Sequence, residues 1–325
     1  MRLAAVSLGF ALALCASGPG RAQNGAEAPK ASAAHAGVDA LTLRTGTSHD
    51  ALFAVAFAGD AGIAVGAGGE LQESADAGKT WKAVAPAPVQ QSLLGVAIDA
   101  DRAVAVGQLG TILVKPSGGA WSAVKSGTTS RLFAVGENRT SIVAAGAFGT
   151  VIKSVDGGAT WTSIAPKWAD FTDGSEPHVF AVKVHGNGAI TLAGEFGLIL
   201  RSDDGGATWA AQHKGEASLF GLDLHDDGNG YAVGQDGTVL RTRDDGKTWE
   251  TLDVGSKANL LGVAFDGNAV FITGMHDVLA SADGGGTWQR PAAEQADGWM
   301  TGIAIPRGAA AVAVGNAGRI VRFGK

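Results

Sequence analysis

The eight residues Ser202-Asp-Asp-Gly-Gly-Ala-Thr-Trp209 form a phrase that recurs along the chain. Similar copies end at Trp81, Trp161, Trp249 and Trp288, and a copy that has lost its aspartate ends at Trp121. The intervals between successive tryptophans of this series are 40, 40, 48, 40 and 39 residues. A period of this size is typical of propeller blades, each of which is one supersecondary unit.

The residue types of the phrase predict a tight hairpin turn. Asp and Ser side chains accept hydrogen bonds from nearby backbone amides, and Gly adopts the positive φ that such turns need. The Trp that follows has a large ring to bury, and we expect it to pack against the neighbouring blade. Five near-complete copies in register make this prediction specific, whereas a single copy would be weak.

Two further motifs recur between the copies of the phrase and define the other strands. An apolar strand comes first in each unit, and a Gly-x-x-Gly hairpin such as Gly194-Glu-Phe-Gly197 follows about 14 residues later, with alternating apolar residues on both sides. The first strands begin at Leu52, Leu93, Leu132, Val179, Leu219, Leu260 and Met300. Each unit therefore reads as four antiparallel strands, the last of which begins at the Trp.

The chain has seven first strands but six Trp-led fourth strands, since it ends at Lys325 after the seventh third strand. The segment Ala40–Leu43 precedes the first blade at the distance expected of a fourth strand, so it can pair with the last blade. Such closure removes exposed sheet edges. We therefore predict an all-β protein: a seven-bladed β-propeller over residues 39–325, with four-stranded antiparallel blades and a ring closed by an N-terminal strand.

The N-terminus predicts export. Residues 1–22 read as a signal peptide, with Arg2, a short apolar segment and small residues up to Ala22, and residues 23–38 read as a flexible leader. We expect a periplasmic or secreted protein. A lipoprotein anchored at Cys15 is the less favoured alternative, because Leu14 occupies a position that needs a small residue.

Charge and hydropathy narrow the choice of partner. A net charge of -6 gives no basic field for nucleic acid or anionic membranes, and no apolar stretch is long enough to span a bilayer. We expect a monomer without a cofactor.

The phrase resembles the Asp-box (BNR) hairpin of sialidase-like propellers. Units of the form Val-Gly-x-x-Gly-x-Ile-x-x-Ser-x-Asp-Gly-Gly-x-Thr-Trp, repeated after a signal peptide, resemble the photosystem II stability and assembly factor family over about residues 39–325. The resemblance implies a binding platform without catalysis, which assists assembly of a membrane-associated complex through a protein partner.

The chain direction places the Gly-x-x-Gly hairpins and the loops that enter the first strands on one face. In closed propellers this face usually carries ligands. Aromatic anchors beside polar groups suit a protein partner. The candidate residues there are Arg131, Phe148, His178, Glu195, Phe196, Asp236, His276 and Trp299. The alternative for Phe148 and Phe196 is that both rings fold back onto blade cores.

The 48-residue interval contains eight extra residues, centred on Pro166–His178. Long loops in compact domains often carry function, so Trp168 and Phe171 join the candidate contact residues. The alternative is an insertion whose Trp168 packs on its own propeller. Its acidic residues match no calcium loop, so we expect no metal.

An enzyme of the sialidase superfamily is the alternative function, as is a carbohydrate-binding propeller. The only tyrosine, Tyr231, lies in an expected core strand, which disfavours a tyrosine nucleophile. Glu195 and Asp236 on neighbouring blades could form a carboxylate pair. On the opposite face, His185 and His225 follow adjacent first strands, and without a third ligand we expect solvated histidines.

Overall fold

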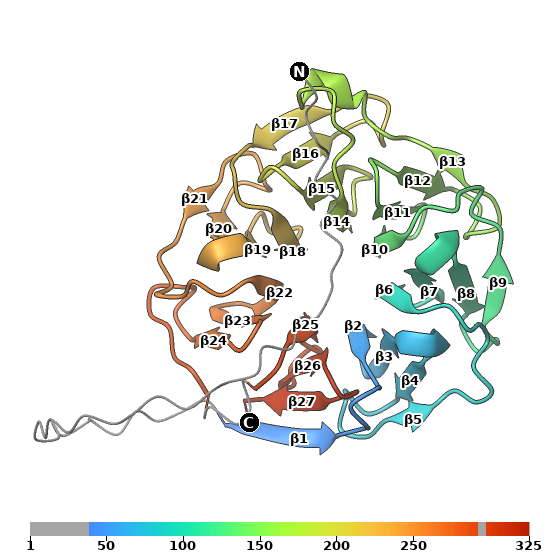
Figure 1. The fold of residues 1–325 in the computed structure, drawn as a ribbon, viewed down its shortest axis with the longest axis vertical. Helices are drawn as coiled ribbons and strands as arrows, with labels where there is room; N and C mark the ends of the chain where they lie inside the picture. The colour runs from blue at the N-terminus through green and yellow to red at the C-terminus, as the bar shows by residue number, and fades with distance from the viewer. Residues whose placement is uncertain (1–38, 292–296, 325) are drawn as a thin grey trace, which may run out of the picture. The chain divides into compact units, whose positions relative to one another are not determined.

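Seven small antiparallel sheets surround a central channel in the computed structural model, which describes residues 39–291 and 297–324 (Figure 1). The predicted seven-bladed propeller is therefore confirmed. The signal peptide and leader predicted for residues 1–22 and 23–38 lie outside the described residues and stay predictions.

The blades follow one another along the chain, and each starts with its innermost strand (Figure 1). Blade 1 comprises β2 (Leu52–Ala58), β3 (Ala61–Gly66), β4 (Leu71–Ser74) and β5 (Lys82–Ala83); blade 2 comprises β6 (Leu93–Ile98), β7 (Arg102–Gly107), β8 (Ile112–Pro116) and β9 (Ser122–Val124). Blade 3 comprises β10 (Leu132–Glu137), β11 (Ile142–Gly146), β12 (Val151–Ser154) and β13 (Thr162–Ser163); blade 4 comprises β14 (Val179–Val184), β15 (Ile190–Gly194), β16 (Ile199–Ser202) and β17 (Ala210–His213). Blade 5 comprises β18 (Leu219–Leu224), β19 (Gly230–Gly234), β20 (Val239–Thr242) and β21 (Glu250–Thr251).

The last two blades differ in their outer strand. Blade 6 comprises β22 (Leu260–Asp266), β23 (Ala269–Gly274) and β24 (Val278–Ser281), and its fourth strand is reduced to the bridge between Ala280 and Gln289. Blade 7 comprises β25 (Met300–Ala304), β26 (Ala311–Gly315), β27 (Ile320–Phe323) and β1 (Ala40–Arg44). The pairing of β1 with β27, Ala40 opposite Phe323, closes the ring as predicted.

Short 3-10 helices complete the described elements, and none of them interrupts a blade. They are η1 (Ala67–Gly69), η2 (Gln108–Gly110), η3 (Trp168–Asp170) and η4 (Gln235–Gly237). In residues 39–291 and 297–324 no helix is long and apolar enough to cross a membrane.

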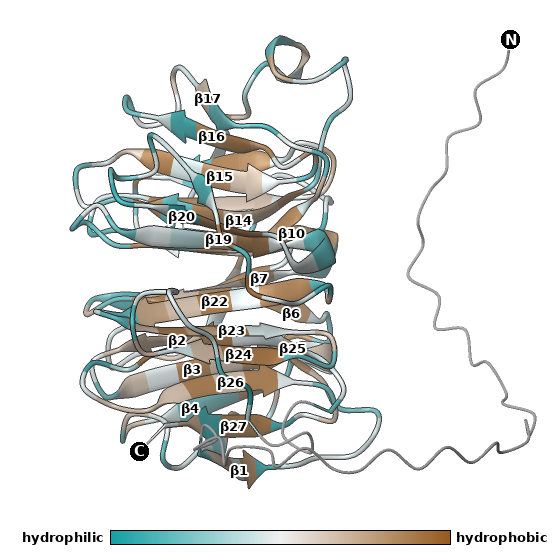
Figure 2. Ribbon diagram, turned by 90° about the vertical axis from the view of Figure 1, so that its left-hand side faces the viewer, coloured by the Kyte–Doolittle hydropathy of each residue, from teal (hydrophilic) through white to brown (hydrophobic). Residues whose placement is uncertain are grey.

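The hydrophobic core lies between neighbouring blades. In Figure 2 the hydrophobic segments lie mostly in the strands, and the hydrophilic ones are concentrated in the loops at the strand ends. Each blade-ending tryptophan packs on the core shared with the preceding blade. Trp161 packs with blades 2 and 3, Trp209 with blades 3 and 4, and Trp288 with blades 5 and 6. Burial of these rings thus holds successive blades together, as the repeat predicted.

The Asp-box turn satisfies its own backbone. In the fourth blade, Ser202 Oγ donates to Asp204 Oδ1 at 2.8 Å and accepts from the Gly206 amide at 2.7 Å. Asp204 also accepts from the amide of Thr208 at 2.9 Å and from its hydroxyl at 2.6 Å. These donated hydrogen bonds stabilise the ionised carboxylate, so they lower the pKa of Asp204.

A cation on the third strand of three blades bridges to the next blade's Asp-box turn. Lys153 Nζ donates to Gly205 O at 2.9 Å, and Arg241 Nη1 donates to Gly284 O at 2.7 Å. Arg201 donates to Asp245 O at 2.6 Å and to Asp245 Oδ2 at 2.8 Å, and its Nε donates to Asp203 Oδ1. The bonds to the next blade therefore join residues that lie more than 40 positions apart in the sequence.

Replacing Arg201 by Met should lower the free energy of unfolding by about 2 kcal/mol, because the buried guanidinium joins two blades and its loss leaves Asp245 without its cation. Urea unfolding followed by tryptophan fluorescence measures the change. Arg243→Met is the matched control on the exposed side of the same turn and should change stability by less than about 0.5 kcal/mol. Equal losses in both variants would contradict the bridging role.

The Asp boxes predict acid sensitivity. Hydrogen bonds from Thr and Ser lower the pKa of Asp76, Asp156, Asp244 and Asp283 to about 2, against an ordinary value of 3.8. A depressed carboxyl pKa gives stability that is complete above 3.8 and is lost as the pH falls toward 2. The urea midpoint should therefore fall steeply across this window. A flat midpoint between these pH values would contradict the assignment.

Candidate functional site

We call the side that carries the hairpins between second and third strands the hairpin face. The second residue of each hairpin has a positive φ, between 53° and 61°. These tip residues are Gly68, Leu109, Phe148, Phe196, Asp236, His276 and Ala317. Four large apolar side chains on these hairpins, Leu109, Phe148, Phe196 and Met275, are 38% to 68% exposed. Phe148 and Phe196 therefore do not fold back onto blade cores.

Left-handed backbone is costly for bulky side chains. A residue with a Cβ pays roughly 1 kcal/mol or more to hold such a φ, whereas glycine does not. Only the first hairpin uses glycine, Gly68, at this position. Leu109, Phe148 and Phe196 thus hold apolar groups in solvent at positions where both backbone and solvation favour another residue.

A ring of half-buried side chains lies at the start of the inner strands, and we call it the collar. Each inner strand carries a register shift at its second residue, the mark of a β-bulge. The displaced residues are Phe53, Leu94, Phe133, Phe180, Phe220, Leu261 and Thr301. Collar rings touch across blade boundaries, with centroids 5.3 Å apart for Phe133 and Phe180 and 5.2 Å apart for Phe180 and Phe220.

His178 connects the collar to an exposed tip. Its ring lies edge-on to Phe148 at 5.1 Å and 5.8 Å from Phe133, and Nδ1 accepts a hydrogen bond from the Phe148 amide at 3.4 Å. The His178 amide donates to Glu195 Oε2 at 2.8 Å. Phe148, His178 and Glu195, predicted separately, are therefore one cluster on blades 3 and 4.

The Glu195 contact is a repeated scaffold feature. Gln235 and Asn316 occupy the same hairpin position and accept hydrogen bonds from the amides of Ser218 and Trp299, at 3.1 Å and 3.2 Å. A side-chain oxygen at this position, from a carboxylate or from an amide, accepts the hydrogen bond of the residue that enters the inner strand.

A second cluster joins blades 6 and 7. The His276 amide donates to Gly298 O at 2.6 Å, and the Gly298 amide donates back to His276 Nδ1 at 3.2 Å. Trp299 stacks on the collar residue Phe53, with centroids 5.8 Å apart and planes 2° apart. Asp236, on blade 5 between the two clusters, is exposed, and its amide lies 3.4 Å from Asn259 Oδ1. Arg131, directly before the inner strand of blade 3, is exposed as well.

The insertion packs against its own propeller. Trp168, in η3, is 8% exposed and packs in the core of blades 3 and 4, where its Nε1 donates to Gly149 O at 3.0 Å. Phe171 is half-buried against the same core. The Trp168 ring fills the space behind the third hairpin, and contact between Trp168 and a partner stays a prediction. The alternative, packing on its own propeller, is what the structure shows.

Two features were missed in the sequence. Leu109 has the same tip position and exposure as Phe148 but was not selected. The collar was read as ordinary strand core, although two adjacent large residues, such as Leu132 and Phe133, interrupt strict alternation and could have indicated a bulge. Among the described residues, no group of three or more His, Cys, Asp or Glu could hold a metal ion.

The closed ring and its turns define a seven-bladed Asp-box β-propeller. Residues 210–323, from the outer strand of blade 4 to the last strand, match the family model of "Photosynthesis system II assembly factor YCF48". This match covers about a third of the chain and agrees with the resemblance that the repeats indicated. No curated protein matches it at the level of sequence.

Solved structures share the fold at low identity. A structure of YCF48 bound to a D1 peptide superposes with a TM-score of 0.69 at 17% identity, covering 90% of this chain and 96% of that one. YCF48 from Cyanidioschyzon merolae gives 0.70 at 17% identity, covering 88% and 98%. U3-55K gives 0.69 at 12% identity, again covering 88% and 98%.

The left-handed tips predict an unusual ranking of variants. Leu109→Gly should be more stable than Leu109→Ala by about 1 kcal/mol, because glycine adopts this φ without strain. Chemical unfolding of both variants measures the difference. Ala123→Gly, in the exposed part of β9, should instead lose about 0.5 kcal/mol. A Leu109→Ala variant as stable as Leu109→Gly would contradict the strain.

Proposed function

We propose that this chain is an exported, non-catalytic assembly factor that binds a protein partner on the hairpin face. The observation that carries the proposal is the set of strained, exposed apolar tips. Leu109, Phe148 and Phe196 combine an unfavourable φ with exposure to solvent. Backbone strain of this kind clusters at binding sites, where a partner compensates it.

The composition of the hairpin face supports a protein partner. Apolar tips on blades 2, 3 and 4 adjoin the charged or polar residues Arg131, Glu195 and Asp236. Large apolar anchors within a polar rim are the usual anatomy of protein–protein interfaces. The collar adds half-buried rings beneath these anchors.

The likeness to YCF48 supports the same class of function. One of the similar structures is YCF48 bound to a D1 peptide, so a propeller of this shape can bind a peptide. By analogy, the client of this chain is a membrane-associated complex. The predicted signal peptide supports a meeting place in the periplasm or outside the cell.

The alternative of a glycoside hydrolase has less support from the geometry. It needs Glu195 and Asp236 as an acid and base, yet Glu195 accepts from the His178 amide just as Gln235 and Asn316 accept in sibling hairpins. That bond assigns the carboxylate to the scaffold. Glycoside turnover that Glu195→Gln abolishes would favour the hydrolase instead.

Loss of two tips should abolish partner capture. The mature chain with Phe148→Ser and Phe196→Ser should retain its thermal midpoint but capture at least about tenfold less of its partner, since exposed anchors dominate such interfaces. A photo-crosslinking residue placed at Leu109, followed by mass spectrometry in the native host, identifies the captured protein.

Val155→Ser is the matched control, because Val155 is 73% exposed but lies in an Asp-box turn on the other face. The same captured protein should be kept by Val155→Ser and lost by the double variant. Equal capture by all three chains would refute the hairpin face as the binding site.

A further inference from the structure

A second concave feature lies on the face opposite the hairpins. The channel opens there into a cavity of about 590 Å³ at the far ends of the inner strands. All seven blades contribute to its wall, from Phe57 in blade 1 to Ile305 in blade 7. Its volume falls within the range of about 300–1,000 Å³ that is usual for small-molecule sites.

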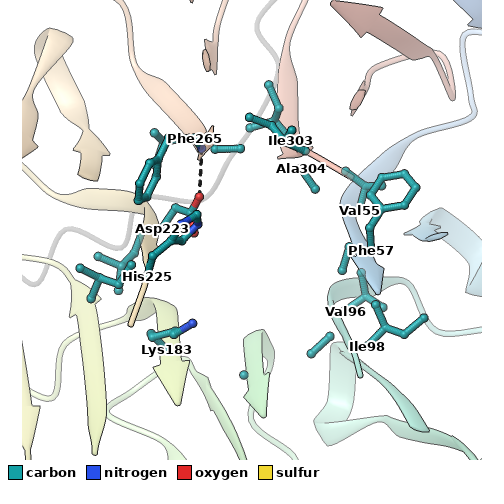
Figure 3. A pocket seen from close by; sticks show the side chains of 18 of the residues that line it. Val55, Phe57, Val96, Ile98, Lys183, Asp223, His225, Phe265, Ile303 and Ala304 are labelled. Atoms are coloured by element: carbon teal, nitrogen blue, oxygen red, sulfur yellow. Dashed lines mark hydrogen bonds and ion pairs between the residues drawn. The ribbon is translucent and has the colours of Figure 1, made fainter. Parts of the chain in front are cut away.

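The cavity is chemically divided. Figure 3 shows Lys183, Asp223 and His225 on one side and the apolar residues Val55, Phe57, Val96 and Ile98 on the other. Ile303 and Ala304 extend the apolar side. A ligand that fills this space must therefore be amphipathic.

Both carboxylate oxygens of Asp223 interact with neighbouring residues. Its Oδ2 accepts from the Phe265 amide at 3.1 Å, and its Oδ1 lies 3.5 Å from His225 Nε2. The His225 ring also stacks on Phe265, with centroids 3.9 Å apart. Hydrogen bonding to Asp223 raises the pKa of His225 above its ordinary 6.5, although burial and Lys183 oppose the shift.

The prediction of solvated histidines is wrong for His185, which is buried, with Nε2 2.9 Å from the Thr191 hydroxyl. The His225 side chain is 41% exposed, and its ring stacks on Phe265. The stacking of His225 on Phe265 could not be predicted from the sequence, because Phe265 lies on the next blade.

The carboxylates of the wall do not neutralise Lys183. Lys183 is half-buried, and none of the ion pairs among described residues involves it. Glu137 is held instead by Arg102 at 2.8 Å, and burial together with Asp99 raises the pKa of Glu137 to about 7. Asp266 and Arg307, which carry opposite charges, also belong to the wall. The polar side thus presents the Lys183 ammonium group, which has no ion-pair partner among the described residues, beside His225, which is paired with Asp223.

We propose that this cavity binds a small amphipathic monocarboxylate, with the carboxylate at Lys183 and the hydrocarbon against Ile98, Ile303 and Ala304. A half-buried ammonium attracts an anion more strongly than an exposed one, because solvent screens it less. The apolar side of the cavity offers no polar partners to a highly charged ligand without a hydrocarbon part, such as inorganic phosphate, and therefore disfavours it. The site is independent of the hairpin face.

Decanoate is the probe, with decanol and decylamine as neutral and cationic counterparts. Isothermal titration calorimetry on the mature chain should show binding of decanoate that is about tenfold tighter than that of decanol, equivalent to about 1.4 kcal/mol, and no binding of decylamine. Lys183→Met should remove this preference while it leaves decanol binding unchanged. Lys125→Met, the same substitution on an exposed lysine at a distance from the cavity, should behave as the wild type.

Ala304→Leu fills the apolar side and should abolish binding of both decanoate and decanol, with an unchanged thermal midpoint as evidence of folding. The Phe148→Ser and Phe196→Ser chain should bind decanoate normally, so failure here and failure on the hairpin face are distinguishable. Equal affinity for decanoate and decanol, an unaltered Lys183→Met variant, or no binding up to about 1 mM would each overturn the proposal. Tighter binding of a short apolar peptide with a free carboxyl end would overturn it as well, and reassign the cavity to a peptide terminus.

Discussion

The seven inner strands approach one another until backbone meets backbone, and the rest of the ring depends on this contact. The third residue of every inner strand is Gly or Ala. A Cβ at Gly262 would lie 2.8 Å from Thr301 O, and one at Gly302 would lie 2.8 Å from the Ala54 Cα. Large side chains at the third position would push neighbouring inner strands apart. The residue at the second position is therefore displaced out of the regular strand pairing. The bulge at the second residue follows from that constraint, and the collar follows from the bulge.

The repeat unit separates residues that stabilise the turns from exposed residues by position. The Asp-box turn uses its Ser or Thr and Asp side chains to satisfy its own amides, so in the five blades with a complete box this part can hardly vary without cost. The first hairpin residue carries a similar duty where Glu195, Gln235 or Asn316 caps an inner strand. The second hairpin residue in blades 2, 3 and 4 has an exposed side chain, and variation there changes the surface without changing the fold.

Local chemistry explains why the architecture was predictable. The Gly-x-x-Gly and Asp-box turns lie within a few residues of the groups that satisfy them, and their repetition set the blade count and the role of Ala40–Leu43. The sequence could not show contacts between residues that are distant in the chain. Trp168 donates a hydrogen bond to Gly149, 19 residues earlier, and His225 stacks on Phe265, some 40 residues later. Periodicity placed Phe148 on the correct face but left two orientations open, because exposure depends on neighbours that the repeat does not specify.

The distribution of tip residues around the ring gives the hairpin face a direction. Leu109, Phe148 and Phe196 occupy consecutive blades, whereas Asp236 and His276 follow on the next two. His178 links the Phe148 tip to the Phe133, Phe180 and Phe220 rings, so these five rings form one connected aromatic cluster. If the proposed partner carries an apolar segment flanked by polar residues, this order of tips favours one orientation of that segment on the hairpin face. The order of the blades in the sequence would then set the orientation without any departure from the sevenfold scaffold.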